Sequence, residues 1–186
     1  GAASQPGGLE GLPQDRPAAS AEKHNRAPAE KAAPANITQA EFDAVWTQAT
    51  QLMAPCDRAV DSATTALQSG NAYTAYPAVQ RAEQTCGSVS LDMFDLDIPR
   101  SAKGEVREKL KEAKDRCQSA MTQKQIAMKG IARVLDGDAR PSAVSAAQED
   151  AERAQAMVLG CAVSFMSAAQ AGGLNFAGME GTTTNE

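Results

Sequence analysis

The stretch FDAVWTQATQLMAPCDRAV, residues 42–60, alternates apolar and polar side chains at spacings of three and four residues. That spacing places the apolar side chains on one face of a helix that packs against a core. The apolar positions are Phe42, Val45, Trp46, Ala49, Leu52, Met53, Cys56, Ala59 and Val60. A capping box of Thr38 and Glu41 predicts where this helix begins, and Gly70 can end it. Pro55 removes one backbone hydrogen bond, so we expect the helix to bend there.

Three further segments show the same helical spacing, and each ends at turn-forming residues. They cover about residues 71–93, 101–136 and 138–172. For the first of these segments, Thr74 is a better predicted cap than Asn71. A helix that starts at Thr74 has its proline in the first turn, where a missing N–H costs little.

Four long helices with short connections pack most simply as an antiparallel four-helix bundle, so we predict an all-α domain over residues 37–172. Residues 1–36 are rich in Ala, Pro, Gly and charged side chains, which predicts a flexible tether. Residues 173–186 are expected to form a flexible tail, with Leu174 and Phe176 as its candidate docking residues. The chain begins with glycine, and we expect that a leader was removed, with a lipid anchor as one form of membrane tether.

The four cysteines lie one on each predicted helix, at core positions. In an antiparallel hairpin, residues equally far from the turn lie at the same height. The midpoint between Cys56 and Cys86 lies in the first turn, and the midpoint between Cys117 and Cys161 lies in the third. Each pair is therefore expected to lie at one height. A bond between Cys86 and Cys117 would require a height difference of roughly 9 Å, which is too large for a disulfide. We therefore predict the disulfides Cys56–Cys86 and Cys117–Cys161.

Two disulfides would place the protein in an oxidising compartment, either the periplasm or the extracellular space. Gly87 and Gly160 each adjoin a cysteine, and their small size is expected to ease the close approach of the helices. Two alternatives stay open. The four cysteines could be reduced and buried as small apolar residues, or they could bind zinc, although no CxxC spacing supports a zinc site.

The predicted bundle lacks the residues of common catalytic and metal centres. The only histidine, His24, lies in the predicted tether, which leaves no His-based metal site, Ser-His-Asp triad or Cys-His dyad in the bundle. Nucleotide-binding and metal-binding motifs do not occur, so we predict no catalytic residue, no cofactor and no metal. The net charge of −5 without a basic cluster argues against nucleic acid as a partner. No apolar run approaches the roughly 20 residues of a membrane span.

These features predict a non-enzymatic, exported helical bundle for protein interaction or scaffolding in the cell envelope, with an unidentified protein partner. The alternative is a carrier of a small apolar ligand. Its candidate pocket between the helices would be lined by Trp46, Tyr73, Tyr76 and Phe165. An apolar cavity of at least about 300 Å³ would favour the carrier, whereas a filled core with an exposed apolar patch would favour the protein partner. An enzyme would need a buried cluster of carboxylates or lysines with perturbed pKa values, which the pattern does not predict.

Overall fold

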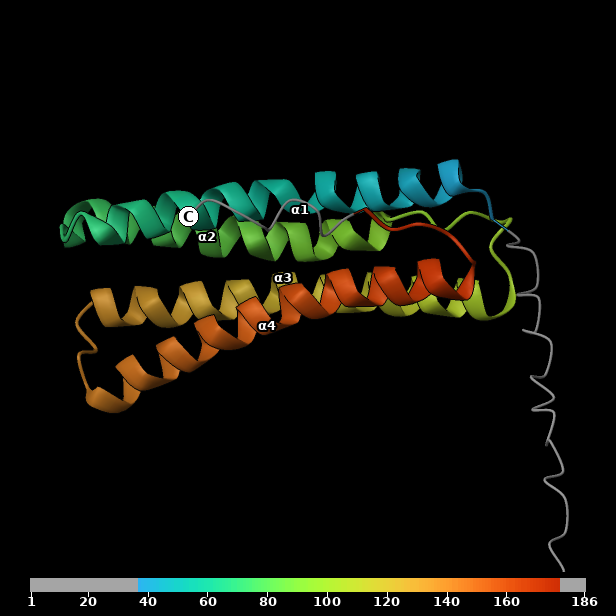
Figure 1. Ribbon diagram of the computed structural model, residues 1–186. Helices are drawn as coiled ribbons and strands as arrows, with labels where there is room; N and C mark the ends of the chain where they lie inside the picture. The colour runs from blue at the N-terminus through green and yellow to red at the C-terminus, as the bar shows by residue number, and fades with distance from the viewer. Residues whose placement is uncertain (1–36, 178–186) are drawn as a thin grey trace, which may run out of the picture. The chain divides into compact units, whose positions relative to one another are not determined.

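The structure, a computed structural model, describes residues 37–177, all of which belong to the unit Ala32–Glu186. The predicted tether at residues 1–36, with His24, and residues 178–186 of the predicted tail lie outside the described residues. The described part is all-α, as predicted, with four helices and no strand (Figure 1). Its elements are α1 (Gln39–Gln68), α2 (Ala72–Asp92), the short 3₁₀ helix η1 (Met93–Asp95), α3 (Gly104–Leu135) and α4 (Pro141–Ala171).

Helix α3 contacts all three other helices. Each helix packs against its neighbour in sequence, and the connections make neighbouring helices antiparallel (Figure 1). Three consecutive residues of α3, Thr122, Gln123 and Lys124, bond to α2, α4 and α1 respectively, because successive side chains on a helix point about 100° apart. Their partners are Ser90 at 2.6 Å, Asp150 at 3.1 Å and Asp57 at 2.5 Å.

The capping box predicted for α1 is confirmed. The Thr38 N–H donates to the Glu41 carboxylate at 2.8 Å, and the Glu41 N–H donates to the Thr38 hydroxyl at 3.2 Å. Gly70, with a φ of 71°, follows the helix and lets the chain turn, because glycine adopts positive φ without a steric cost. Helix α1 continues through Pro55 as one element, and the bend expected there stays a prediction.

Helix α2 begins earlier than predicted. The Asn71 side chain caps it by accepting a hydrogen bond from the Tyr73 N–H at 3.0 Å, so Thr74 is not the cap. Asparagine is as good a cap as threonine or better, and here it lies directly after the turn at Gly70. The hydroxyl of Thr74 instead donates to the Asn71 carbonyl at 2.9 Å. As a result, Pro77 lies beyond the first turn, where it leaves the carbonyl four residues before it without a helical donor.

The hydrophobic core has two parts that differ in which helices form them. The larger part contains side chains from all four helices, among them the fully buried Phe42, Leu110 and Phe165. The smaller part contains side chains from α1, α2 and α3 only: Ala63, Val79, Ala82, Met128 and Ala132. Helix α4 diverges from α1 and α2 toward its own N-terminus (Figure 1). Before Cys161, its buried side chains are Ala147 and Ala154.

The first residues of the predicted tail pack on the bundle. Gly173, with a φ of 64°, turns the chain after α4, and the Asn175 backbone then exchanges two hydrogen bonds of 2.9 Å with the Gln39 side chain at the start of α1. Leu174 and Phe176, the two candidate docking residues, pack against the larger core cluster. The folded bundle therefore extends past its predicted end, because two large apolar side chains gain a place on the core.

Candidate functional site

The structure joins the four cysteines in the two predicted pairs. Cys56 and Cys86 link α1 to α2, and Cys117 and Cys161 link α3 to α4. In each pair the Cα atoms are 4.6 Å apart, and the side chains are buried. Each disulfide therefore locks one helical hairpin of the bundle, a feature typical of proteins in an oxidising compartment.

The two glycines beside the cysteines do not have the role predicted for them. A Cβ atom added at Gly87 would meet the side chain of Gln125 on α3, not a residue of α1. A Cβ atom added at Gly160 would meet no atom within 4 Å, so this position borders open space. The expectation that both glycines ease the approach of the disulfide-bonded helices is wrong, because a Cβ atom at either position would not meet the hairpin partner.

A cluster of aromatic rings fills the core where α1 begins and α4 ends. The rings of Trp46 and Phe165 meet edge to face with centroids 4.9 Å apart, and those of Phe42 and Phe165 are 6.3 Å apart. Phe176 adds a further edge-to-face contact with Trp46 at 5.0 Å. Such pairs stabilise the fold by about 0.5–1.5 kcal/mol beyond the area that they bury. These rings fill one another's space instead of lining a pocket.

The four aromatic residues predicted to line one pocket are divided between the two ends of the bundle. Trp46 and Phe165 belong to the aromatic cluster, whereas Tyr73 and Tyr76 lie at the start of α2 beside a different cavity. Most of α1, about 30 Å at 1.5 Å per residue, separates the two pairs. The prediction of one pocket lined by all four is therefore wrong, because the constant rise of α1 places the two pairs at different heights of the bundle.

Helix α4 carries an uncharged stretch that the bundle covers only in part. No charged residue occurs from Ala154 to Ala171, yet Leu159 is 55% exposed and Val163 is 39% exposed. With Ala156 and Gly160, they form what we call the uncharged face of α4. Helix α4 is long and apolar enough to cross a membrane, as the core helices of folded proteins also can be, and a third of its most apolar part is buried. Helical spacing did not indicate this face, although the absence of charged residues from position 154 to 171 was a signal for it.

A shallow cavity of about 300 Å³ lies beside the uncharged face, between α3 and α4. Ala156, Met157 and Gly160 line it from α4, and Arg116 and Ser119 line it from α3. The small side chains at Ala156 and Gly160, four residues apart, leave a groove between larger neighbours. Grooves of this kind receive the side-chain ridge of a packing helix. The uncharged face and this cavity together form the candidate site.

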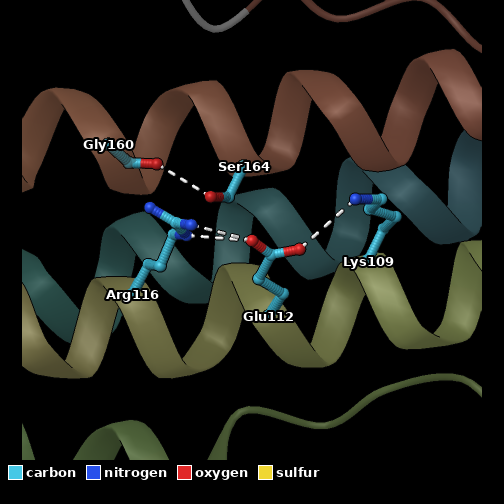
Figure 2. Close-up of polar contacts among 5 residues, drawn as sticks. All are labelled: Lys109, Glu112, Arg116, Gly160 and Ser164. Carbon is cyan, nitrogen blue, oxygen red and sulfur yellow. Dashed lines mark hydrogen bonds and ion pairs between the residues drawn. The ribbon is translucent and has the colours of Figure 1, made fainter.

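An ion-pair network lies on α3 next to this cavity. Glu112 accepts hydrogen bonds from Arg116 at 2.9 Å and from Lys109 at 3.4 Å (Figure 2). On α4, the Ser164 hydroxyl donates to the Gly160 carbonyl at 2.9 Å (Figure 2). The hydrogen bonds from Arg116 and then Lys109 lower the pKa of Glu112 from its usual 4.5. Arg116 is thereby held on α3, which leaves the α4 side of the cavity uncharged.

Stability is expected to fall at acidic pH, because Glu41, Glu112 and Asp138 all have lowered pKa values. The causes are hydrogen bonds, chiefly from the Thr38 backbone, from Arg116 and from Arg140 respectively. A pKa that is lower in the folded state stabilises above the unfolded value and is lost as the pH falls through the folded value. We expect the urea midpoint to decrease between pH 6 and pH 3. The urea midpoint of the Glu112→Gln protein should decrease less than that of the wild type. An equal decrease would contradict the contribution of Glu112 to the pH dependence.

The described residues 37–177 contain no group of three or more His, Cys, Asp or Glu side chains placed to hold a metal ion. A cavity of about 480 Å³ lies between η1 and α3, where it is lined by both acidic and basic side chains. The Lys114 amino group there is already engaged, because it donates to the carbonyls of Phe94 and Leu96 at 2.6 and 2.9 Å. Because this cavity is lined by both acidic and basic side chains, its charges do not indicate which class of ligand it would bind.

Comparisons of the chain with protein-family models, with curated proteins and with solved structures found no match.

Proposed function

We propose that the protein is a non-enzymatic, exported helical bundle that binds a protein partner through the uncharged face of α4, as an interaction or scaffolding module of the cell envelope. The observation that carries the proposal is the exposure of Leu159 and Val163 within a stretch without charged residues. Apolar side chains on one such face are typical of a surface that a partner covers. The partner element that fits best is an amphipathic helix, whose apolar ridge would enter the groove at Ala156 and Gly160.

Export is supported by the two disulfides, which persist in the periplasm and outside the cell but are rare in a reducing cytosol. The absence of a catalytic role is supported by the chemistry of the described part. The described part has no histidine, and its four cysteines are all in disulfides. Most catalytic centres with an activated nucleophile use a histidine as the base, a free cysteine as the nucleophile, or both.

The filled aromatic core favours a protein partner over the apolar carrier. Phe42 and Phe165 are fully buried, and Phe176 closes the end of their cluster. A carrier would need an enclosed apolar space of at least about 300 Å³ between the helices. The cavity beside the uncharged face and the cavity at Tyr73 and Tyr76 have at least this volume, but both are open to solvent and not enclosed.

The test is site-specific photocrosslinking in the cells that make the protein. A photoreactive residue at position 159 or 163 is expected to give a discrete adduct of one mass. The same residue at Leu91, an equally apolar position that is 66% exposed on α2, is the matched control and should not give it. An adduct of twice the mass of the chain would identify a second copy as the partner.

Charge substitutions on the face make the test specific. With the photoreactive residue at position 163, Leu159→Lys is expected to reduce the adduct at least about tenfold, which corresponds to roughly 1.4 kcal/mol of binding free energy. Leu91→Lys should leave the adduct unchanged, and both surface changes should alter the free energy of unfolding by less than about 0.5 kcal/mol. Adducts that are absent, or that persist equally in the Leu159→Lys protein, would overturn the proposal.

A further inference from the structure

A cavity of about 550 Å³ lies where α2 begins and α3 ends, and its lining combines aromatic rings with one carboxylate. We call it the tyrosine cavity, and its lining residues are Ala72, Tyr73, Tyr76, Pro77, Leu135 and Asp136. None of them belongs to the uncharged face of α4. A result at one site therefore does not depend on the other.

The two tyrosines differ in burial: Tyr76 packs against the smaller core cluster, and Tyr73 lies almost fully in solvent. Tyr73 is 93% exposed and stands at the rim of the cavity. Tyr76 is half-buried, and its hydroxyl accepts a hydrogen bond from the Gln80 side chain at 3.0 Å, which holds the ring in place. A tyrosine exposed to this degree gains little from burial, yet it presents a flat π face to whatever enters the cavity.

Asp136 supplies the only charge of the lining, and its carboxylate is not engaged. Within the part of the chain that the structure describes, no ion pair or hydrogen bond involves this carboxylate. Asp138, two residues later, shows the contrast, because Arg140 donates to both of its oxygens at 2.6 and 2.7 Å. Arg133 lines a different cavity, together with Asp138 and Arg140, and does not line the tyrosine cavity.

We infer that the tyrosine cavity is a binding site for a guanidinium cation. Aromatic faces attract cations through the ring quadrupole, and a carboxylate supplies the opposite charge. A guanidinium ion fits better than an ammonium ion, because it is planar, stacks on aromatic rings and pairs with a carboxylate in a two-pronged geometry. The cavity is open to water, so each contact raises the affinity only a few-fold. The dissociation constant for a guanidinium ion is therefore expected to be about 1 mM.

The chain contains only two tyrosines, and both line the cavity, so labelled tyrosine reports on this site alone. In an NMR titration of the full chain with ring-labelled tyrosine, N-acetylarginine amide should shift both signals in a saturable manner. N-acetylcitrulline amide has nearly the same shape without the charge, and it should bind at least about fivefold more weakly. Absent shifts, or equal affinities for the two probes, would overturn the inference.

Variants assign the binding to named side chains. Asp136→Asn removes the charge at an exposed position and should weaken binding of N-acetylarginine amide at least about threefold. Asp61→Asn makes the same change at an exposed site on α1 outside the cavity and should have no effect. Tyr73→Leu keeps an apolar side chain without the π face, and the Tyr76 signal then measures the expected loss. Unchanged affinity in both Asp136→Asn and Tyr73→Leu would refute the site.

A last pair of probes distinguishes two sources of guanidinium. Methylguanidinium represents a free small cation, and a capped Gly-Arg-Gly peptide represents arginine in a polypeptide. If the natural ligand is a polypeptide, the peptide should bind at least about threefold more tightly, since backbone contacts at the rim add to those of the side chain. Binding of either probe that Asp136→Asn weakens supports the site, and binding of neither overturns it.

Discussion

Replacing Cys117 and Cys161 together by alanine is expected to lower the free energy of unfolding by about 4 kcal/mol. This disulfide closes a loop of 44 residues and the Cys56–Cys86 disulfide closes one of 30, so the second pair of substitutions should cost slightly less. The reason is that each cross-link restricts the unfolded chain, and the restriction grows slowly with loop length. The cavities left by four buried side chains would add to the loss.

Urea unfolding followed by far-ultraviolet circular dichroism measures these losses. The variant that lacks both disulfides should lose about 7 kcal/mol, which is comparable with the whole stability of an ordinary domain. We therefore expect it to be largely unfolded in water without added reductant. The wild-type protein in strong reductant should show the same loss without any substitution. A loss below about 1 kcal/mol for either single pair would contradict the structural role of that disulfide.

Phe165→Ala is expected to lower the free energy of unfolding by about 3–5 kcal/mol. The Phe165 ring is fully buried and contacts the rings of both Phe42 and Trp46, so its removal leaves a cavity that the rigid helices cannot close. Trp46 is the only tryptophan of the chain, and its ring centroid lies 4.9 Å from that of Phe165. Its fluorescence therefore reports both the local change in the folded state and the unfolding midpoint.

Phe94→Ala is the matched control for Phe165→Ala. It removes the same atoms from a side chain that is 60% exposed at η1, and it should alter the stability by less than about 0.5 kcal/mol. Equal losses in the two variants would show that the aromatic cluster does not anchor α4 to α1.

The disulfide pairing could be predicted because it depends only on the number of residues between each cysteine and the turn. Helices have a constant rise, so Cys56 and Cys86 must be level if they are equally far from a short turn. The structure has that turn between Gln68 and Ala72, close to the midpoint of this pair. The start of α1 could be predicted for a related reason, since the capping box is a local arrangement within four residues.

The errors arose where a local rule had two solutions or where distant segments meet. Thr74 and Asn71 can both cap a helix, and the geometry of the turn at Gly70 decided for Asn71. The function assigned to Gly87 was wrong because its environment is set by Gln125, far away in the sequence.

Helical periodicity and cysteine spacing therefore specified four helices, their order and their two covalent links, because these depend on contacts within a helix or across one turn. The packing of whole helices decided the rest. It brought α3 into contact with all three other helices and left Leu159 exposed on an uncharged face. A residue pattern defines which side of a helix is apolar, but only the neighbouring helices determine how much of that side they cover.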